Sequence, residues 1–277
     1  MPLDTVRVTV QDSFGNRVLT ASHEITLAPG AGSPSGATLG GTKVLEASNG
    51  LAEFSDLTLD KVGSYTLTAA ATGLTGATSS SFSIGAGAPS RLTFSVQPGN
   101  VTAGSNFSPA LQVRIEDAEG NLTSSTAQVT LAVTGGGATV EGTSQVNAVN
   151  GVATFSSARV SKAGTWTLTA SSGSLTTATS SSFSVSAGSA STLAFTTQPA
   201  SALAGATLSA VAVTVRDAHG NDITGSTASI TLAVGTGPSG ATFSGTKTVD
   251  AVAGVASFED LSLDKAGDYT LTASAAS

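Results

Sequence analysis

A stretch of ten residues occurs three times, with small changes, in this chain of 277 residues. It reads DKVGSYTLTA at 60–69, SKAGTWTLTA at 161–170 and DKAGDYTLTA at 264–273. The copies lie about 100 residues apart, and self-similarity at a fixed period indicates that one structural unit is repeated. The chain can therefore hold three similar units, each too long for the repeat of a solenoid.

Other motifs recur in the same order around this stretch. Each copy has a run of alternating apolar residues that ends in an Asp-x-x-Gly-Asn turn: VRVTVQDSFGN at 6–16, VRIEDAEGN at 113–121 and VAVTVRDAHGN at 211–221. Alternation with a period of two predicts strands with one buried face. No sustained spacing of three and four residues predicts a helix. Short strands separated by regular turns predict an all-β fold of antiparallel sandwiches, of the size of immunoglobulin-like domains.

The repeat divides the chain into three expected modules. We predict module 1 at 1–86, module 2 at 87–187 and module 3 at 188–277. The first copy has no counterpart of SRLTFSVQP at 90–98, and the third has no counterpart of TSSSFSI at 78–84. Module 1 is therefore expected to lack its first strand and module 3 its last. The chain is then either a segment of a longer array, which we favour, or a subunit that assembles head to tail.

The turns have a chemical signature of their own. Asp12, Asp117 and Asp217 open a type I turn, and a glycine three residues later allows a left-handed backbone. The expected structural glycines at this place are Gly15, Gly120 and Gly220.

The aromatic residue of the repeated stretch is expected to be structural. Tyr65 and Tyr269 fit a tyrosine corner, in which the hydroxyl bonds to backbone a few residues upstream. The second copy departs from the pattern, with Ser161 and Trp166. The alternative role, a platform for stacking sugars, is disfavoured because packing explains an aromatic at the same position of every copy.

The ordered set V-x-V-x-D-x-x-G-N, A-T-x-x-G-T, N-G-x-A-x-F and D-K-A-G-x-Y-T-L-T-A resembles bacterial immunoglobulin-like domains of the invasin and intimin type. The resemblance extends over nearly the whole chain. It implies rods on bacterial surface adhesins, in which other, specialised tip domains usually carry recognition. It therefore implies an extracellular location on the bacterial cell surface.

Composition narrows the function classes. The net charge of −7 disfavours nucleic acid, which is bound by Lys and Arg. No apolar run reaches the roughly 18–20 residues of a membrane span. The absence of cysteine excludes disulfides and thiolate chemistry.

The search for chemistry finds weak candidates. His23 and His219 occupy different module positions without the partners of a catalytic triad, so we predict that the chain is no enzyme. No cofactor is expected, although Asp56, Asp60, Asp260 and Asp264 are weak candidates for calcium. The recurring Lys61, Lys162 and Lys265 are read as turn lysines rather than as isopeptide donors. Asn106 and Asn121 match the N-glycosylation pattern, which is common by chance in a chain so rich in Ser and Thr.

These observations favour an extracellular stalk or filament segment whose partners are neighbouring repeats or other copies of the same protein. One alternative is an adhesive module that binds a glycan or a host protein. Another is a head-to-tail filament subunit.

Overall fold

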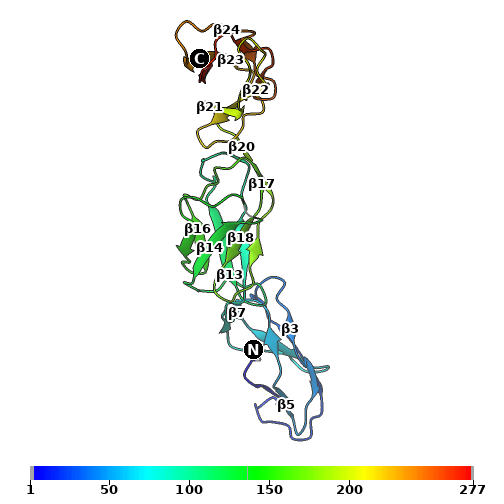
Figure 1. Cartoon of the computed structure of the whole chain (residues 1–277). Helices are drawn as coiled ribbons and strands as arrows, with labels where there is room; N and C mark the ends of the chain where they lie inside the picture. The colour runs from blue at the N-terminus through cyan, green and yellow to red at the C-terminus, as the bar shows by residue number, and fades with distance from the viewer. Residues whose placement is uncertain (1–2, 136, 276–277) are drawn as a thin grey trace.

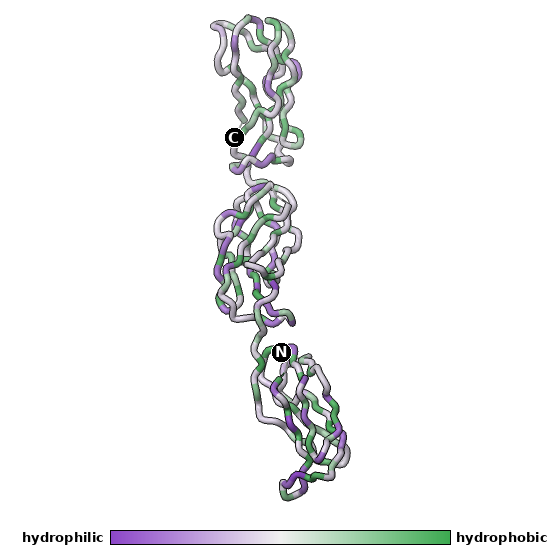
Figure 2. Tube along the Cα trace, turned by 60° about the horizontal axis from the view of Figure 1, so that its bottom comes forward, coloured by the Kyte–Doolittle hydropathy of each residue, from purple (hydrophilic) through white to green (hydrophobic). Residues whose placement is uncertain are grey.

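The computed structural model describes residues 3–135 and 137–275. These residues form strands, turns and loops with no helix, which confirms the all-β prediction. The strands gather in three bodies that follow one another end to end in sequence order, as the colours of Figure 1 show. In the rotated view of Figure 2 the same three bodies are joined by single crossings of the chain. We call them modules 1, 2 and 3.

Module 2 shows the complete strand set. Its strands are β11 (Arg91–Val96), β12 (Val101–Thr102), β13 (Leu111–Glu116), β14 (Gln128–Val133), β15 (Gln145–Asn147), β16 (Val152–Phe155), β17 (Gly164–Trp166), β18 (Leu168–Ser171), β19 (Ala178–Thr179) and β20 (Phe183–Ser186).

The strand order of module 2 is that of an immunoglobulin-like sandwich. One sheet has the order β11-β13-β16, corresponding to strands A, B and E, and the facing sheet has the order β15-β14-β18-β19, which contains strands C, F and G. The short strand β12 leaves the first sheet and pairs in parallel with β20, the second half of strand G. Strand F is likewise split, into β17 and β18.

Module 1 contains strands that correspond to B through G. They are β1 (Val6–Thr9), β2 (Glu24–Pro29), β3 (Leu39–Gly40), β4 (Val44–Glu46), β5 (Leu51–Phe54), β6 (Thr58–Leu59), β7 (Gly63–Tyr65), β8 (Leu67–Ala70), β9 (Ala77–Thr78) and β10 (Phe82–Ile84). Among the described residues, β1 pairs only with β5, so no A strand lies beside it.

Module 3 contains strands that correspond to A through F. They are β21 (Ala190–Thr197), β22 (Val211–Asp217), β23 (Ser229–Thr236), β24 (Phe243–Ser244), β25 (Thr248–Asp250), β26 (Val255–Phe258), β27 (Ser262–Leu263) and β28 (Thr270–Ala275). Within the described part of the chain, β28 pairs only with β23, and no G strand follows. Within the described residues, the strands of module 1 thus begin at B and those of module 3 end at F.

The three modules share one register between strands B and E. Leu111 faces Phe155 in module 2, as Val6 faces Phe54 in module 1 and Val211 faces Phe258 in module 3. The alternation seen in the sequence thus points the same side chains inward in each copy.

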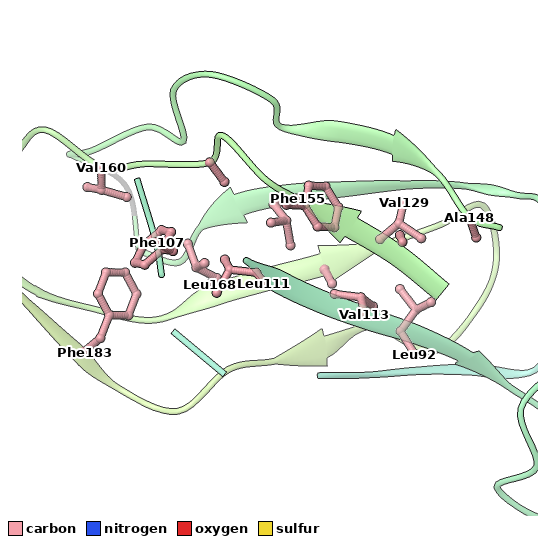
Figure 3. Packing of buried hydrophobic residues seen from close by; sticks show 14 of the residues in the cluster. Leu92, Phe107, Leu111, Val113, Val129, Ala148, Phe155, Val160, Leu168 and Phe183 are labelled. Atoms are coloured by element: carbon pink, nitrogen blue, oxygen red, sulfur yellow. The ribbon is translucent and has the colours of Figure 1, made fainter. Parts of the chain in front are cut away.

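Each module has a hydrophobic core of its own. In module 2 the side chains of Leu111, Val113, Phe155 and Leu168 are completely buried between the two sheets (Figure 3). Phe107 and Phe183 close one end of this core with an edge-to-face contact at 5.1 Å between ring centroids. Separate clusters fill modules 1 and 3. Each module is therefore a sandwich with a separate core.

Candidate functional site: the joints between modules

The polar contacts that cross from one module to the next centre on a single asparagine. Asn121 ends the B–C turn of module 2 and reaches the E–F turn of module 1. Its side-chain Nδ2 donates to the carbonyl of Asp60 at 2.9 Å, and its Oδ1 accepts from the amide of Val62 at 3.2 Å. One side chain thus pairs with both a backbone acceptor and a backbone donor of the preceding module. We call this arrangement joint 1.

Joint 2, between modules 2 and 3, repeats this arrangement. Asn221 donates to the carbonyl of Ser161 at 2.7 Å and accepts from the amide of Ala163 at 2.8 Å. Asn221 is 9% exposed, so these bonds lie largely out of contact with water. Two independent joints with the same atoms in the same roles indicate a built contact, because packing by chance would not repeat it.

The aspartate that opens each B–C turn orients the asparagine. In module 3, Asp217 accepts from the Asn221 amide at 2.9 Å and from its side-chain Nδ2 at 2.8 Å. In module 2, Asp117 holds Asn121 in the same way. The single glycine of each Asp-x-x-Gly-Asn turn has a positive φ, 86° at Gly15, 92° at Gly120 and 80° at Gly220. A glycine adopts this conformation without the steric cost of a side chain.

The same carboxylates hold the linkers. Asp117 accepts from the amide of Gly87 at 2.9 Å, and Asp217 accepts from the amide of Gly188 at 2.8 Å. A glycine in a linker usually leaves the chain free to bend. Here the carboxylate holds the amide of Gly87, so the linker and the asparagine that reaches the preceding module are bound to the same side chain.

These contacts set the ionisation of the two aspartates. Burial by itself would raise the pKa of Asp217, which is 1% exposed. The hydrogen bonds from the Asn221 side chain, Gly188 and the Asn221 amide outweigh burial and lower the pKa of Asp217 from 3.8 to about 2. The pKa of Asp117 is lowered by the same competition. Both joints therefore hold a buried carboxylate in its charged form at neutral pH.

The repeated aromatic residue bonds to the backbone of the E–F turn, the same turn to which the joint asparagine of the next module binds. The Tyr65 hydroxyl donates to the carbonyl of Lys61 at 2.8 Å, one residue after the carbonyl of Asp60. In module 2 the indole Nε1 of Trp166 donates to the carbonyl of Lys162 at 2.9 Å. The indole N–H of Trp166 therefore donates to the carbonyl that corresponds to the one bonded by the Tyr65 hydroxyl.

Module 3 has the same corner. The Tyr269 hydroxyl donates to the carbonyl of Lys265 at 2.8 Å. Tyr65 is buried and stacks on Phe82 of β10, with 6.0 Å between ring centroids, whereas Tyr269 is half-buried. The difference follows from the strand G residue that covers Tyr65.

Joint 2 has one additional contact. His219, the third residue of its B–C turn, lies against Gly104 in the loop before β13, because a methyl group added at Gly104 would collide with the imidazole ring. The backbone φ of Gly104 is 77°. Gly104 therefore suits this place both by its conformation and by the room it leaves. The second histidine, His23, is exposed in module 1.

The weak calcium candidates cap backbone in the C–D region of their own modules. Asp60 accepts from the amide of Thr38 at 2.7 Å, and Asp264 accepts from the amide of Thr242 at 2.6 Å. Asp56 and Asp260 bond the amide and hydroxyl of Thr42 and Thr246 in the same manner. Within residues 3–135 and 137–275, no group of three or more His, Cys, Asp or Glu side chains gathers around a common point. Calcium binding stays a prediction.

The turn lysines and the glycosylation patterns also find a place. Lys61 Nζ donates to the carbonyl of Ser35 at 2.8 Å, and Lys265 Nζ to that of Ser239 at 2.9 Å. Asn121 of the Asn-Leu-Thr pattern has both ends of its amide engaged in joint 1. A glycan on that nitrogen is therefore incompatible with the joint.

The sequence alone predicts no structural role between modules for Asn121 or Asn221. A signal for them existed, because Asn16, Asn121 and Asn221 follow the turn glycine in all three copies. The conformation of the turn accounts for the Asp and the Gly. The asparagine is explained only by its contacts with the preceding module.

No family description matches this sequence, and no curated protein matches it either. The solved structures similar to the chain include the Escherichia coli adhesin FdeC, with 20% identity over 98% of this chain and 87% of that chain and a TM-score of 0.40. Invasin, described as a bacterial integrin-binding protein, has 16% identity over 97% of this chain and 52% of its own, with a TM-score of 0.31. The D00-D0 domain of intimin has 12% identity over 66% of this chain and 92% of its own, with a TM-score of 0.36. Similarity at this level leaves the ligand and the role of this chain open.

Among the described residues, no helix has the length and apolar character needed to cross a membrane.

Proposed function

We propose that the chain is a rigid spacer in a bacterial surface protein, located outside the cell. In this proposal the modules at 1–86, 87–187 and 188–277 are set in fixed succession by joints 1 and 2, and the function is to hold whatever lies at either end at a constant distance. The observation that supports it is the repeated asparagine contact, in which one side chain pairs with a carbonyl and an amide of the preceding module.

The energy of a joint is sufficient to restrict bending. A hydrogen bond within a protein contributes about 1 kcal/mol net, and one whose partner is left buried without a replacement costs about 1–3 kcal/mol. Asn221 makes two such bonds across joint 2. Losing them costs about 2 kcal/mol, which changes the ratio of closed to bent joints roughly 30-fold.

The experiment measures the spread of distances across each joint. The chain has no cysteine, so single cysteines introduced for spin labels react without competition. Glu53, Thr154 and Ser257 occupy the same exposed position of strand E in the three modules. Labels at 53 and 154 report joint 1, and labels at 154 and 257 report joint 2.

The unmodified joints are expected to give narrow distance distributions by pulsed electron paramagnetic resonance. Asn121→Ala is expected to broaden the distribution across joint 1 alone, and Asn221→Ala that across joint 2 alone. The matched control is Asn147→Ala, an exposed asparagine on β15 whose side chain makes no hydrogen bond to another module within the described residues. Broad distributions in the unmodified chain would refute the proposed function.

A further inference from the structure

The two most exposed large hydrophobic side chains lie on opposite ends of the rod. Among the described residues, Phe14 is 88% exposed and Leu203 is 84% exposed. Phe14 belongs to the B–C turn of module 1, and Leu203 lies two residues before Gly205 in the loop before β22 of module 3. Isolated apolar residues are common on surfaces, but Phe14 corresponds to His219 of joint 2, and Leu203 lies two residues before the counterpart of Gly104.

The B–C turn of module 1 has the geometry of the turns that form joints. Asp12 accepts from the Asn16 amide at 2.8 Å and from its side-chain Nδ2 at 3.2 Å, as Asp117 and Asp217 do with their asparagines. Asn16 is exposed, and its side chain bonds only within its own turn in the described part of the chain. The asparagine half of a joint is thus preformed here.

The E–F turn of module 3 has the geometry of the turns that receive an asparagine. Asp264 and Ala266 correspond to Ser161 and Ala163 of joint 2, and the aromatic corner of Tyr269 shapes the turn between them. No hydrogen bond from residues 3–135 or 137–275 reaches the carbonyl of Asp264 or leaves the amide of Ala266. This turn lies near β24, at the upper end of the rod in Figure 1.

The residues around Phe14 and Leu203 also correspond to residues of joint 2. Phe14 corresponds to His219, the residue that lies against Gly104 in joint 2. Gly205 corresponds to Gly104, has a φ of 79° and has no atom within 4 Å of the place where a side chain would begin. An aromatic ring at the position of Phe14 therefore has room at Gly205, beside Leu203.

We propose that these two surfaces are complementary halves of a third joint, whose partner is a second copy of this chain. In that joint Asn16 of one copy pairs with the carbonyl of Asp264 and the amide of Ala266 of the other, while Phe14 covers Gly205 and Leu203. The inference rests on the proposed function, because it extends the joint that the spacer uses. It identifies the two surfaces as the contact between one copy of this chain and the next.

A contact of this size associates weakly between free molecules, so the test supplies a covalent link of the natural type. Joining two binding partners raises the effective concentration to the millimolar range. The test protein is one polypeptide that contains two copies of the chain. Residues 1–274 of the first copy are followed by residues 172–207, which provide a G strand, a linker and an A strand, and then by residues 3–277 of the second copy. Ser274 and Leu3 correspond to Ser171 and Leu208, so each splice keeps the order of the repeat.

Spin labels at Ser257 of the first copy and Glu53 of the second span the new joint, and labels at Thr154 and Ser257 of the first copy provide joint 2 as the reference. We expect equally narrow distance distributions at both joints. In the second copy, Asn16→Ala is expected to broaden the new joint, with Asn147→Ala as the control that leaves it narrow.

The possible failures are distinct. A broad distribution at the new joint beside a narrow one at joint 2 would overturn this inference and leave the proposed function intact. A narrow new joint that Asn16→Ala does not broaden would show that other contacts hold it, and would overturn the inference as well. Broad distributions at both joints would refute both proposals.

Discussion

Removing the charge of Asp217 is expected to lower the free energy of unfolding of module 3 by about 2 kcal/mol. This carboxylate accepts hydrogen bonds from Gly188, His219 and Asn221, and is 1% exposed. Its pKa falls from 3.8 to about 2 on folding. One pKa unit corresponds to 1.36 kcal/mol, so the shift corresponds to about 2 kcal/mol of stability for the charged form.

The sign of the pH dependence follows from the direction of the shift. Because the folded pKa lies below the ordinary value, the contribution of Asp217 is present in full above about pH 4 and is lost as the pH falls toward 2. Acid in this window, and Asp217→Asn at neutral pH, should therefore have similar effects on module 3.

Scanning calorimetry measures the effect. For a domain of 60–100 residues, 1 kcal/mol moves the melting temperature by about 4–8 °C, so Asp217→Asn is expected to lower one transition by about 10 °C. Trp166 is the only tryptophan, and its fluorescence identifies the transition of module 2. The matched control is Asp12→Asn, which changes the same turn where it is exposed and water can replace the lost bonds. Equal shifts for the two variants would refute the account of joint 2.

Three further changes test the parts that support the joints. Tyr65→Phe leaves the Lys61 carbonyl without its donor in a buried corner, and is expected to lower the free energy of unfolding in urea by about 1–3 kcal/mol. Tyr269→Phe, in a half-buried corner, is expected to lower it by less than about 1 kcal/mol. Equal losses would contradict the importance of burial. Trp166→Phe removes the Nε1 donor and is expected to cost about 0.5–1.5 kcal/mol in module 2, and no change in unfolding would show that the indole contact contributes nothing. Gly104→Ala places a methyl group where His219 lies and is expected to broaden the distance distribution across joint 2 while joint 1 stays narrow, whereas an unchanged joint 2 would show that the imidazole simply moves aside.

The fold could be predicted because its determinants are local. The alternation of apolar residues in strands B and E predicts that Leu111 faces the core together with Phe155, and the same holds for the corresponding pairs of the other copies. Each Asp-x-x-Gly-Asn turn is recognised from five consecutive residues. Each of these motifs is a weak predictor by itself, and its recurrence in three copies makes the prediction of the fold stronger. The aromatic position was readable for the same reason, since Tyr65 and Lys61 are four residues apart.

The joints could not be predicted because their partners are distant in sequence. Asn121 bonds to residues about 60 positions away, and nothing in the intervening chain shows that the B–C turn of one module meets the E–F turn of the module before it. That meeting depends on how the linker leaves strand G and enters strand A. The glycine at 87 is compatible with a flexible linker, and its local sequence does not show that the Asp117 carboxylate, 30 residues further on, holds its amide.

Small-angle X-ray scattering of the unmodified chain tests the central claim most directly. Three modules of about 30 Å each, held in fixed succession, are expected to give the scattering of a single rod roughly 90 Å long, with a radius of gyration that is unchanged by salt. Scattering from a compact particle, or from three beads that bend freely about the joints, would contradict the account.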